Sequence, residues 1–126
     1  MKTNRIRVGV NGYGVIGKRV ADAVRVQPDM ELVGVADIIS DYRIKVAVWL
    51  DIPLYASLPE KASEMRDAGL PVAGVLKDLM GHVDVMVDCT PKGIAAKNLE
   101  GYKSAGVKAI IQGGEKHSVT GHSFVA

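Results

Sequence analysis

The sequence has little cysteine and few aromatic residues. Among its 126 residues there is one cysteine, Cys89, one tryptophan and one phenylalanine. A single cysteine excludes an intramolecular disulfide framework and a multi-cysteine metal site, and it agrees with a reducing compartment. No block of one charge sign is present either, since the formal net charge is +2. Neither nucleic acid nor a membrane surface is therefore expected as a partner.

Long hydrophobic runs are also lacking. The first apolar run follows a charged start and is too short for a signal peptide or a membrane span, so a cytoplasmic location is expected. No internal repeat, low-complexity tract or Ser/Pro-rich linker divides the chain. We therefore expect one domain over residues 1–126, and hydrophobic residues at 48% of the composition are sufficient for its core.

A glycine-rich segment follows the first apolar run. Gly12, Gly14 and Gly17 have the spacing G-x-G-x-x-G, and a helical pattern begins directly after them. In the dinucleotide-binding fingerprint the first glycine makes a tight turn, the second lets a pyrophosphate approach the backbone, and the third lets the helix close onto the strand. The pyrophosphate would lie on free N–H groups at the helix start. An ordinary tight turn is the alternative for the same spacing.

Asp37 lies 20 residues after Gly17, at the end of the second apolar run. This is the distance at which the fingerprint has an acidic residue that binds the ribose hydroxyls of NAD. A carboxylate there favours NAD over NADP, because NADP carries a 2′-phosphate, although NADP remains possible. The alternative is that Asp37 faces solvent and only begins the next turn.

Strand-like and helix-like segments alternate along the chain. Strands are predicted at 6–10, 31–36, 54–56, 71–74, 83–91 with its exit loop, and 107–111, with the start of another at 122–126. Helices are predicted at 15–27, 41–50, 60–68, 75–80 and 93–105. This order predicts an α/β fold, a doubly wound and mainly parallel Rossmann-like sheet. Ligands bind such sheets where the strand order reverses, so the loops at 12–17 and 89–91 would flank the site.

Two of the predicted helices have a face expected to point inward. In the helix at 15–27 this face carries Ile16, Val20, Ala23 and Val24. In the helix at 41–50 it carries Ile44, Val48 and Trp49.

No catalytic residue and no metal site is predicted. Cys89 lies at a strand exit, where it could be a nucleophile, but a small buried residue at the end of a core strand is the better interpretation. Asp84 and Asp88 are four positions apart, which could suggest a carboxylate pair. We expect Asp84 at the strand entrance and Asp88 near the site or capping the next helix. The three histidines lack metal-ligand spacing with acidic or cysteine partners.

Three motifs resemble one family closely. They are Val-Asn-Gly-Tyr-Gly-Val-Ile-Gly-Lys-Arg-Val at 10–20, Val-Asp-Cys-Thr-Pro-Lys-Gly at 87–93, and Gly-Val-Lys-Ala-Ile-Ile-Gln-Gly-Gly-Glu-Lys-His at 106–117. Together they resemble the archaeal-type glyceraldehyde-3-phosphate dehydrogenases over nearly the whole chain. Members of that family oxidise glyceraldehyde 3-phosphate with NAD or NADP and inorganic phosphate, through a cysteine thioester, as homotetramers.

The resemblance implies further cofactor-binding residues. Val15 and Ile16 match positions at the helix start that contact the dinucleotide, and Gly114, beside Gly113, matches a loop glycine near the nicotinamide half. The resemblance also implies three further residues in the wall of the site, Asn11, Thr90 and Pro91.

The chain departs from the family at two points. Many members have Lys-Thr after the second strand, suited to a 2′-phosphate, where this chain has Asp37-Ile38. The Ser-Cys-Asn-Thr-Thr segment that holds the family's nucleophile would lie beyond Ala126, so glyceraldehyde 3-phosphate would bind only with the missing domain. We expect the chain to bind dinucleotide without catalysing the reaction. The alternatives are a free-standing nucleotide-binding or sensor module and, disfavoured by the loop at 112–117, the reductase half of a semialdehyde or dihydrodipicolinate type of enzyme.

Overall fold

A computed structural model describes residues 5–38, 42–90 and 94–111, and the predicted strand at 122–126 lies outside these ranges. The strands are β1 (Ile6–Asn11), β2 (Met30–Asp37), β3 (Leu54–Ala56), β4 (Val72–Val75), β5 (Val85–Asp88) and β6 (Lys108–Ile111). The helices are α1 (Val15–Arg25), α2 (Tyr42–Trp49), α3 (Pro59–Asp67), α4 (Leu76–Met80) and α5 (Ile94–Ser104). Each agrees with a predicted element within a few residues at its ends.

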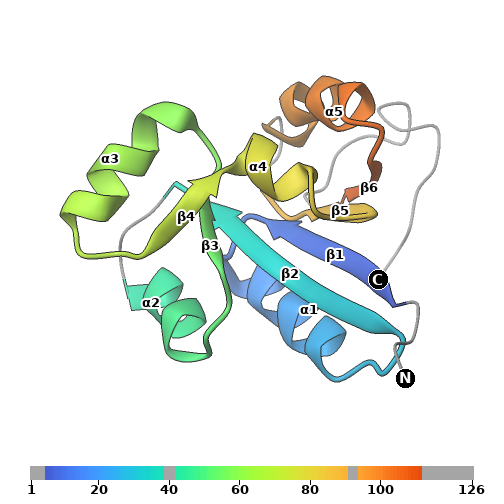
Figure 1. The fold of residues 1–126 in the computed structure, drawn as a ribbon, viewed down its shortest axis with the longest axis horizontal. Helices are drawn as coiled ribbons and strands as arrows, with labels where there is room; N and C mark the ends of the chain where they lie inside the picture. Colours follow the sequence, from blue (N-terminus) through green and yellow to red (C-terminus); the bar gives the residue numbers. More distant parts are fainter. Residues whose placement is uncertain (1–4, 39–41, 91–93, 112–126) are drawn as a thin grey trace.

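In the described ranges the strands form one parallel six-stranded sheet with the order β4-β3-β2-β1-β5-β6. Chain order therefore reverses between β1 and β5, after the strands from β1 to β4 have been added in one direction. Helices cover both faces of the sheet, with α1 and α2 on one side and α4 and α5 on the other (Figure 1). This arrangement confirms the predicted doubly wound α/β fold.

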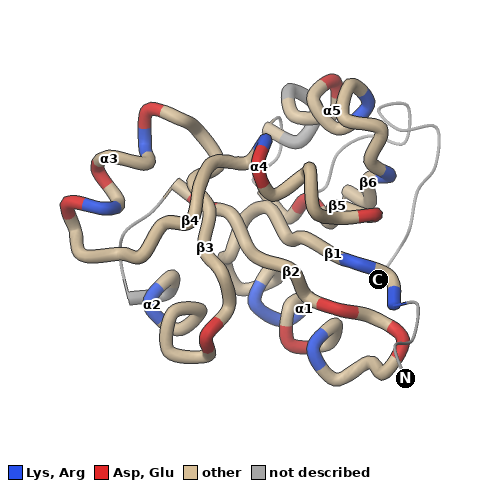
Figure 2. Tube along the Cα trace, in the orientation of Figure 1, with Lys and Arg blue, Asp and Glu red and all other residues tan. Residues whose placement is uncertain are grey.

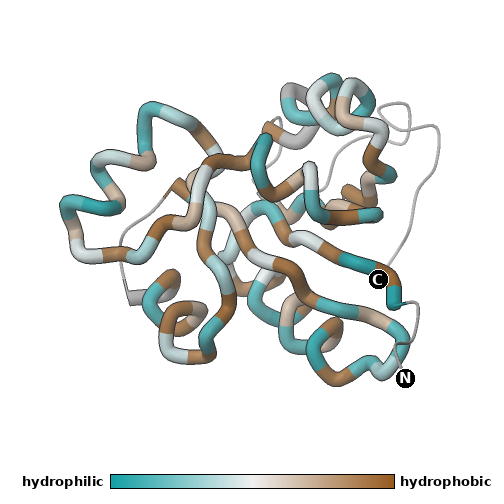
Figure 3. Tube along the Cα trace, viewed as in Figure 1, coloured by the Kyte–Doolittle hydropathy of each residue, from teal (hydrophilic) through white to brown (hydrophobic). Residues whose placement is uncertain are grey.

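Each face of the sheet has its own hydrophobic cluster. Residues of β1, β2 and β3 pack with Ala21 of α1, Ile44 of α2 and Met65 of α3 on one side. On the other side, Met86 of β5 packs with Leu79 of α4 and Tyr102 of α5. Hydrophobic residues accordingly follow the strands, whereas the helices alternate between hydrophobic and hydrophilic positions (Figure 3). Burial on two sides explains why the strands have continuous apolar runs rather than alternating ones.

Lys and Arg are interspersed with Asp and Glu along α1, α3 and α5 (Figure 2). None of the helices that the structure describes has the length and apolar character needed to cross a membrane.

Two expectations about inward-facing side chains are wrong. In α1, Ile16 is 53% exposed and Ala23 is exposed, whereas Gly17, Ala21 and Val24 are buried. In α2, Trp49 is 74% exposed, while Ile44 is completely buried. Ala47 and Val48 of the same helix pack on the core, so the inward face of α2 runs through them and periodicity alone placed Trp49 on the wrong side.

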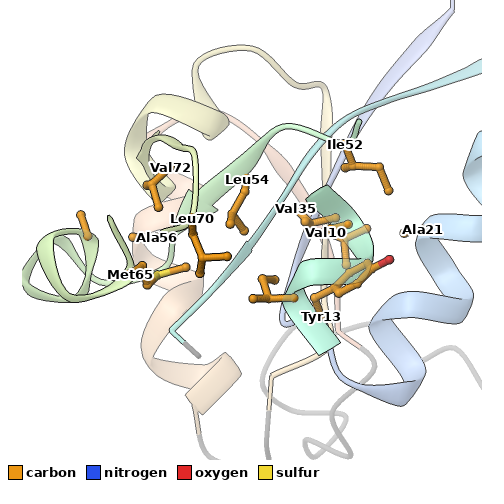
Figure 4. Packing of buried hydrophobic residues seen from close by; sticks show 13 residues of the cluster. Val10, Tyr13, Ala21, Val35, Ile52, Leu54, Ala56, Met65, Leu70 and Val72 are labelled. Atoms are coloured by element: carbon orange, nitrogen blue, oxygen red, sulfur yellow. The ribbon is translucent and has the colours of Figure 1, made fainter. Parts of the chain in front are cut away.

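The turn from β1 into α1 is fixed by backbone packing. Gly12 has φ +96°, a conformation that side-chain-bearing residues rarely adopt. At Gly17, a Cβ atom would lie 1.8 Å from the carbonyl oxygen of Gly12, so only glycine allows α1 to approach the turn this closely. The intervening Tyr13 is 1% exposed, and its ring lies beside Val10 and Val35 (Figure 4). The turn is thus anchored in the core rather than suspended above it.

We predict different stability effects for alanine at two glycines of this turn. Gly17→Ala should lower the free energy of unfolding by on the order of 3 kcal/mol, because the added methyl group must displace backbone. Gly14→Ala should change it by less than about 1 kcal/mol, since a Cβ atom at Gly14 would have, apart from its chain neighbours, no heavy atom of the described segments within 4 Å. Urea titrations followed by circular dichroism measure both values. Equal losses in the two variants would contradict the packing assigned to Gly17.

Candidate functional site

The reversal of strand order places two loops side by side at the carboxyl ends of β1 and β5. Asn11 pairs with Asp88 at the last position of this strand pair, and the Cys89 N–H group donates to the Asn11 carbonyl oxygen at 2.7 Å. A Cβ atom on Gly12 would lie 2.9 Å from backbone atoms of Cys89 and Thr90. The glycine-rich turn and the loop after β5 therefore meet backbone to backbone, at the location where doubly wound sheets bind ligands.

The second glycine of the motif faces open space. Gly14 is the N-cap of α1, and no side chain caps the helix there. The first turn of α1 contains no acidic residue, and the side chains of Val15 and Ile16 are 65% and 53% exposed. The Lys18 N–H group donates to the Gly14 carbonyl oxygen at 2.9 Å. N–H groups ahead of that bond have no acceptor within the helix, so this end can bind an anion.

Asp37 lies beside the glycine-rich turn, at the carboxyl end of β2 where the sequence predicted it. One oxygen of its half-buried carboxylate accepts a hydrogen bond from the Tyr13 N–H group at 2.6 Å, and the other accepts one from Ile38 at 2.7 Å. The side chain is thus held against the turn rather than directed only into solvent. The negative charge of Asp37 therefore lies next to the turn that contains Gly14, the N-cap of α1.

The predicted wall residues lie deeper than expected. Asn11 is completely buried, and its side chain donates to the Tyr102 hydroxyl and accepts from the Ser57 hydroxyl. Thr90 is 7% exposed, and its hydroxyl donates to Asp88. The side chains of both residues are therefore hydrogen-bonded within the protein, which leaves their backbone as the part nearest the site. Pro91, Gly113 and Gly114 lie outside the described residues.

Asp88 is a central residue of the site that sequence reasoning placed only approximately. Its carboxylate is completely buried and accepts hydrogen bonds from Tyr102, Asn98 and Thr90. An aspartate inside an apolar strand is itself a signal, because a buried carboxylate requires donors. Two of the donors, Asn98 and Tyr102, lie one turn apart in a helix that follows in the sequence, and the third, Thr90, lies in the loop directly after β5.

Asp84 and Asp88 do not form a carboxylate pair. Asp84 precedes β5 and accepts hydrogen bonds from the backbone and guanidinium of Arg7, with Nη2 to Oδ1 at 3.1 Å. These bonds and the positive charge of Arg7 lower the pKa of Asp84. Asp88 lies at the opposite end of the same strand, so the two carboxylates lie at opposite ends of β5.

Cys89 has the environment of a structural thiol. It is partly buried, and burial, followed by the neighbouring Asp88 carboxylate, raises its pKa to about 12. A thiol with this pKa is protonated at neutral pH and is a poor nucleophile. Within the described ranges, no three His, Cys, Asp or Glu side chains form a group that could hold a metal ion.

Comparison with known proteins agrees with this geometry. A family model described as "Dihydrodipicolinate reductase, N-terminus" matches residues 6–115. Among solved structures, GenD2 from gentamicin A biosynthesis in complex with NAD has a TM-score of 0.61 at 19% identity and covers 86% of this chain and 27% of its own. The UDP-N-acetylglucosamine 3-dehydrogenase GnnA from Acidithiobacillus ferrooxidans has a TM-score of 0.61 at 23% identity, and the match covers 85% of this chain and 29% of GnnA. At these identities the likeness establishes the Rossmann-like fold alone.

Curated relatives are much more similar in sequence. The glyceraldehyde-3-phosphate dehydrogenase of Methanothermobacter thermautotrophicus is 50% identical over 119 residues, which are 94% of this chain and 35% of the relative. That of Thermococcus kodakarensis is 52% identical over 122 residues, 97% of this chain and 36% of the relative. The chain thus spans about a third of the length of these relatives.

The two kinds of match carry different enzyme names. The family model carries the name of one alternative raised by the sequence, a dihydrodipicolinate type of reductase, whereas the relatives at about 50% identity carry the name of the first hypothesis. Both names are those of oxidoreductases, and the chain aligns with about a third of the length of the curated relatives. The chain therefore belongs to the family described as dihydrodipicolinate reductase, N-terminus, and within it is homologous to the archaeal glyceraldehyde-3-phosphate dehydrogenases over about a third of their length.

Proposed function

We propose that the chain binds a nicotinamide dinucleotide, with the pyrophosphate on the glycine-rich turn at the start of α1. The observation that carries this proposal is the difference among the three motif glycines. Gly12 and Gly17 are required by close backbone packing, whereas a Cβ atom on Gly14 would have, its chain neighbours aside, no heavy atom of the described residues within 4 Å. Internal packing does not require glycine at position 14, and approach of a phosphate to the backbone provides a reason for it.

The surrounding residues fit such a ligand. The pyrophosphate would accept hydrogen bonds from the backbone N–H groups at the start of α1, near Gly14, Val15 and Ile16. No carboxylate lies in the first turn of α1 to repel it. Asn11 and Thr90 would contribute through their backbone, because their side chains are bonded inside the protein. Contacts from Pro91, Gly113 and Gly114 remain predictions from the family resemblance.

We further propose that NAD is preferred over NADP, on the basis of Asp37. Its carboxylate, held beside the turn by the Tyr13 N–H group, would accept hydrogen bonds from the ribose hydroxyls of NAD. A 2′-phosphate would put like charges side by side. For unit charges about 4 Å apart, the repulsion is about 1 kcal/mol at the dielectric constant of water and about 4 kcal/mol at an effective dielectric constant near 20. The preference should thus lie between about fivefold and several hundredfold.

The parent reaction that best matches this domain is the oxidation of glyceraldehyde 3-phosphate. This proposal rests on the relatives at about 50% identity that carry that enzyme name. In that reaction the nicotinamide would accept the hydride, and this chain would bind and orient the dinucleotide. Cys89, protonated and partly buried, is unsuited to form the thioester, so we assign the chain no catalytic residue.

Replacing Gly14 tests the proposed site directly. Gly14→Val should weaken NAD binding at least about tenfold, about 1.4 kcal/mol, because its side chain would occupy the space assigned to the pyrophosphate. Gly101→Val is the matched control: in the part of the chain that the structure describes, its Cβ atom would likewise meet no heavy atom outside its own helix within 4 Å, but Gly101 lies in α5. Isothermal titration calorimetry measures both affinities. Equal affinity in Gly14→Val and the wild type would show that the pyrophosphate binds elsewhere.

A second experiment tests the proposed cofactor preference. Asp37→Asn removes the charge and keeps an oxygen for the Tyr13 N–H group, so NAD should lose most of its advantage over NADP. Asp37→Ser should have the same effect. Asp29→Asn removes an identical charge just before β2, at the opposite end of the strand from Asp37, and should leave the ratio of NAD to NADP affinity unchanged. Titrations of NAD and NADP against all four proteins decide the point, and an unaltered ratio in Asp37→Asn would exclude Asp37 from ribose recognition.

The environment of Cys89 predicts slow alkylation. A pKa of about 12 against an ordinary 9.0 reduces the thiolate fraction at pH 8 on the order of 1000-fold. The folded chain should therefore react with iodoacetamide about that much more slowly than the chain in urea. Its rate should rise about tenfold per pH unit while the fold persists. Mass spectrometry follows the modification, and equally fast labelling of both states would restore Cys89 as a candidate nucleophile.

A further inference from the structure

A chain of hydrogen bonds beneath the candidate site connects β1, β5, α5 and the residue that follows β3. The Ser57 hydroxyl, just after β3, donates to Asn11 Oδ1 at 2.6 Å. Asn11 Nδ2, at the end of β1, donates to the Tyr102 hydroxyl of α5 at 2.9 Å. Tyr102 in turn donates to Asp88 Oδ2, at the end of β5, at 2.5 Å. We call these four residues the Asp88 cluster.

The Asp88 carboxylate is also bonded on its other sides. Asn98 Nδ2 donates to Oδ2 at 3.0 Å, and both the N–H group and the hydroxyl of Thr90 donate to Oδ1, the former at 2.9 Å. Asp88, Asn11 and Tyr102 are all completely buried. In such surroundings, loss of one partner leaves the others unsatisfied, so the whole set depends on each member.

The Asp88 cluster, together with Thr90 that donates to it, contacts the glycine-rich turn at two points. Asn11 is the residue directly before Gly12, and Thr90 supplies part of the backbone against which Gly12 packs, 2.9 Å from an added Cβ atom. The bonds of Asn11 and Thr90 therefore fix both sides of that backbone contact. Displacement of either residue would move Gly12 relative to α1 and Gly14.

The direction of the bonds is fixed by Tyr102. Burial, and after it the neighbouring Asp88 carboxylate, raises the pKa of the Tyr102 phenol well above its usual value. The phenol thus remains protonated, so that it donates to Asp88 and accepts from Asn11. Phenylalanine at this position would keep the ring and interrupt the chain of bonds at its centre.

We propose that Asp88 and Tyr102 are positioning residues for dinucleotide binding: through Asn11 and Thr90, they hold the glycine-rich turn in the conformation that accepts the pyrophosphate. This inference rests on the proposed function and adds to it, because neither side chain touches the ligand. Tyr102 acts from α5, which is remote in sequence from the turn. The cluster thereby links the position of α5 to the affinity of the site.

Tyr102→Phe is the central test, with NAD as the probe and the 126-residue chain as the protein. It should weaken NAD binding about fivefold or more at a temperature well below its melting point. It should also shift the backbone amide signals of Gly12 and Gly14 in a ¹H–¹⁵N correlation spectrum. Asp88→Asn should act in the same direction. Asp84→Asn, the same change just before the same strand, should leave the affinity within about twofold and the two glycine signals in place.

The outcomes separate this inference from the proposed function. Failure of the wild-type chain to bind NAD would overturn the proposed function, and the positioning role with it. A second outcome would overturn the positioning role alone. In it the wild type binds NAD, and Tyr102→Phe has the same NAD affinity and the same Gly12 and Gly14 signals as the wild type, even if its melting temperature is lower. Ser57→Ala, which removes only the outermost donor, replaces Asp88→Asn if the latter does not fold. A loss of NAD affinity in Ser57→Ala that is smaller than the loss in Tyr102→Phe would support the positioning role.

Discussion

The close packing of two backbone segments, Gly12 against the start of the loop after β5, is the constraint on which the candidate site depends. It requires a positive φ at Gly12 and no Cβ atom there, and it requires a further glycine at position 17, where α1 meets the same turn. Because β1 and β5 are neighbours in the sheet, this contact forms only once the strand order reverses. Local sequence and global topology thus depend on each other at this point.

Beneath that contact lies a layer of polar side chains, which is unusual for the interior of a domain. A buried carboxylate and a buried amide lower stability unless every donor and acceptor finds a partner. Here their partners come from α5 and from the residues that follow β3 and β5. Polar groups of this kind favour one arrangement of the elements over alternatives with a similar hydrophobic core. These side chains therefore hold the backbone of the candidate site in one position.

Much of this architecture could be predicted from the sequence because its signals are local. Alternating apolar and helical segments gave the fold, and glycine spacing with Asp37 20 residues on located the turn and its neighbouring carboxylate. The bonds among Ser57, Asn11, Tyr102 and Asp88 could not be predicted, since they join residues up to 91 positions apart. Periodicity failed at Ile16 and Trp49, which are exposed although their neighbours Gly17 and Val48 are buried or packed against the core.

The exposure of Trp49 has a practical consequence for spectroscopy. It is the only tryptophan in the sequence, and its indole is already in contact with water at the end of α2 in the folded protein. Its emission therefore resembles that of a solvated indole before and after unfolding. Intrinsic tryptophan fluorescence thus reports poorly on the core of this domain, whereas the fully buried Tyr13 and Tyr102 rings give absorbance and near-ultraviolet dichroism signals that follow it.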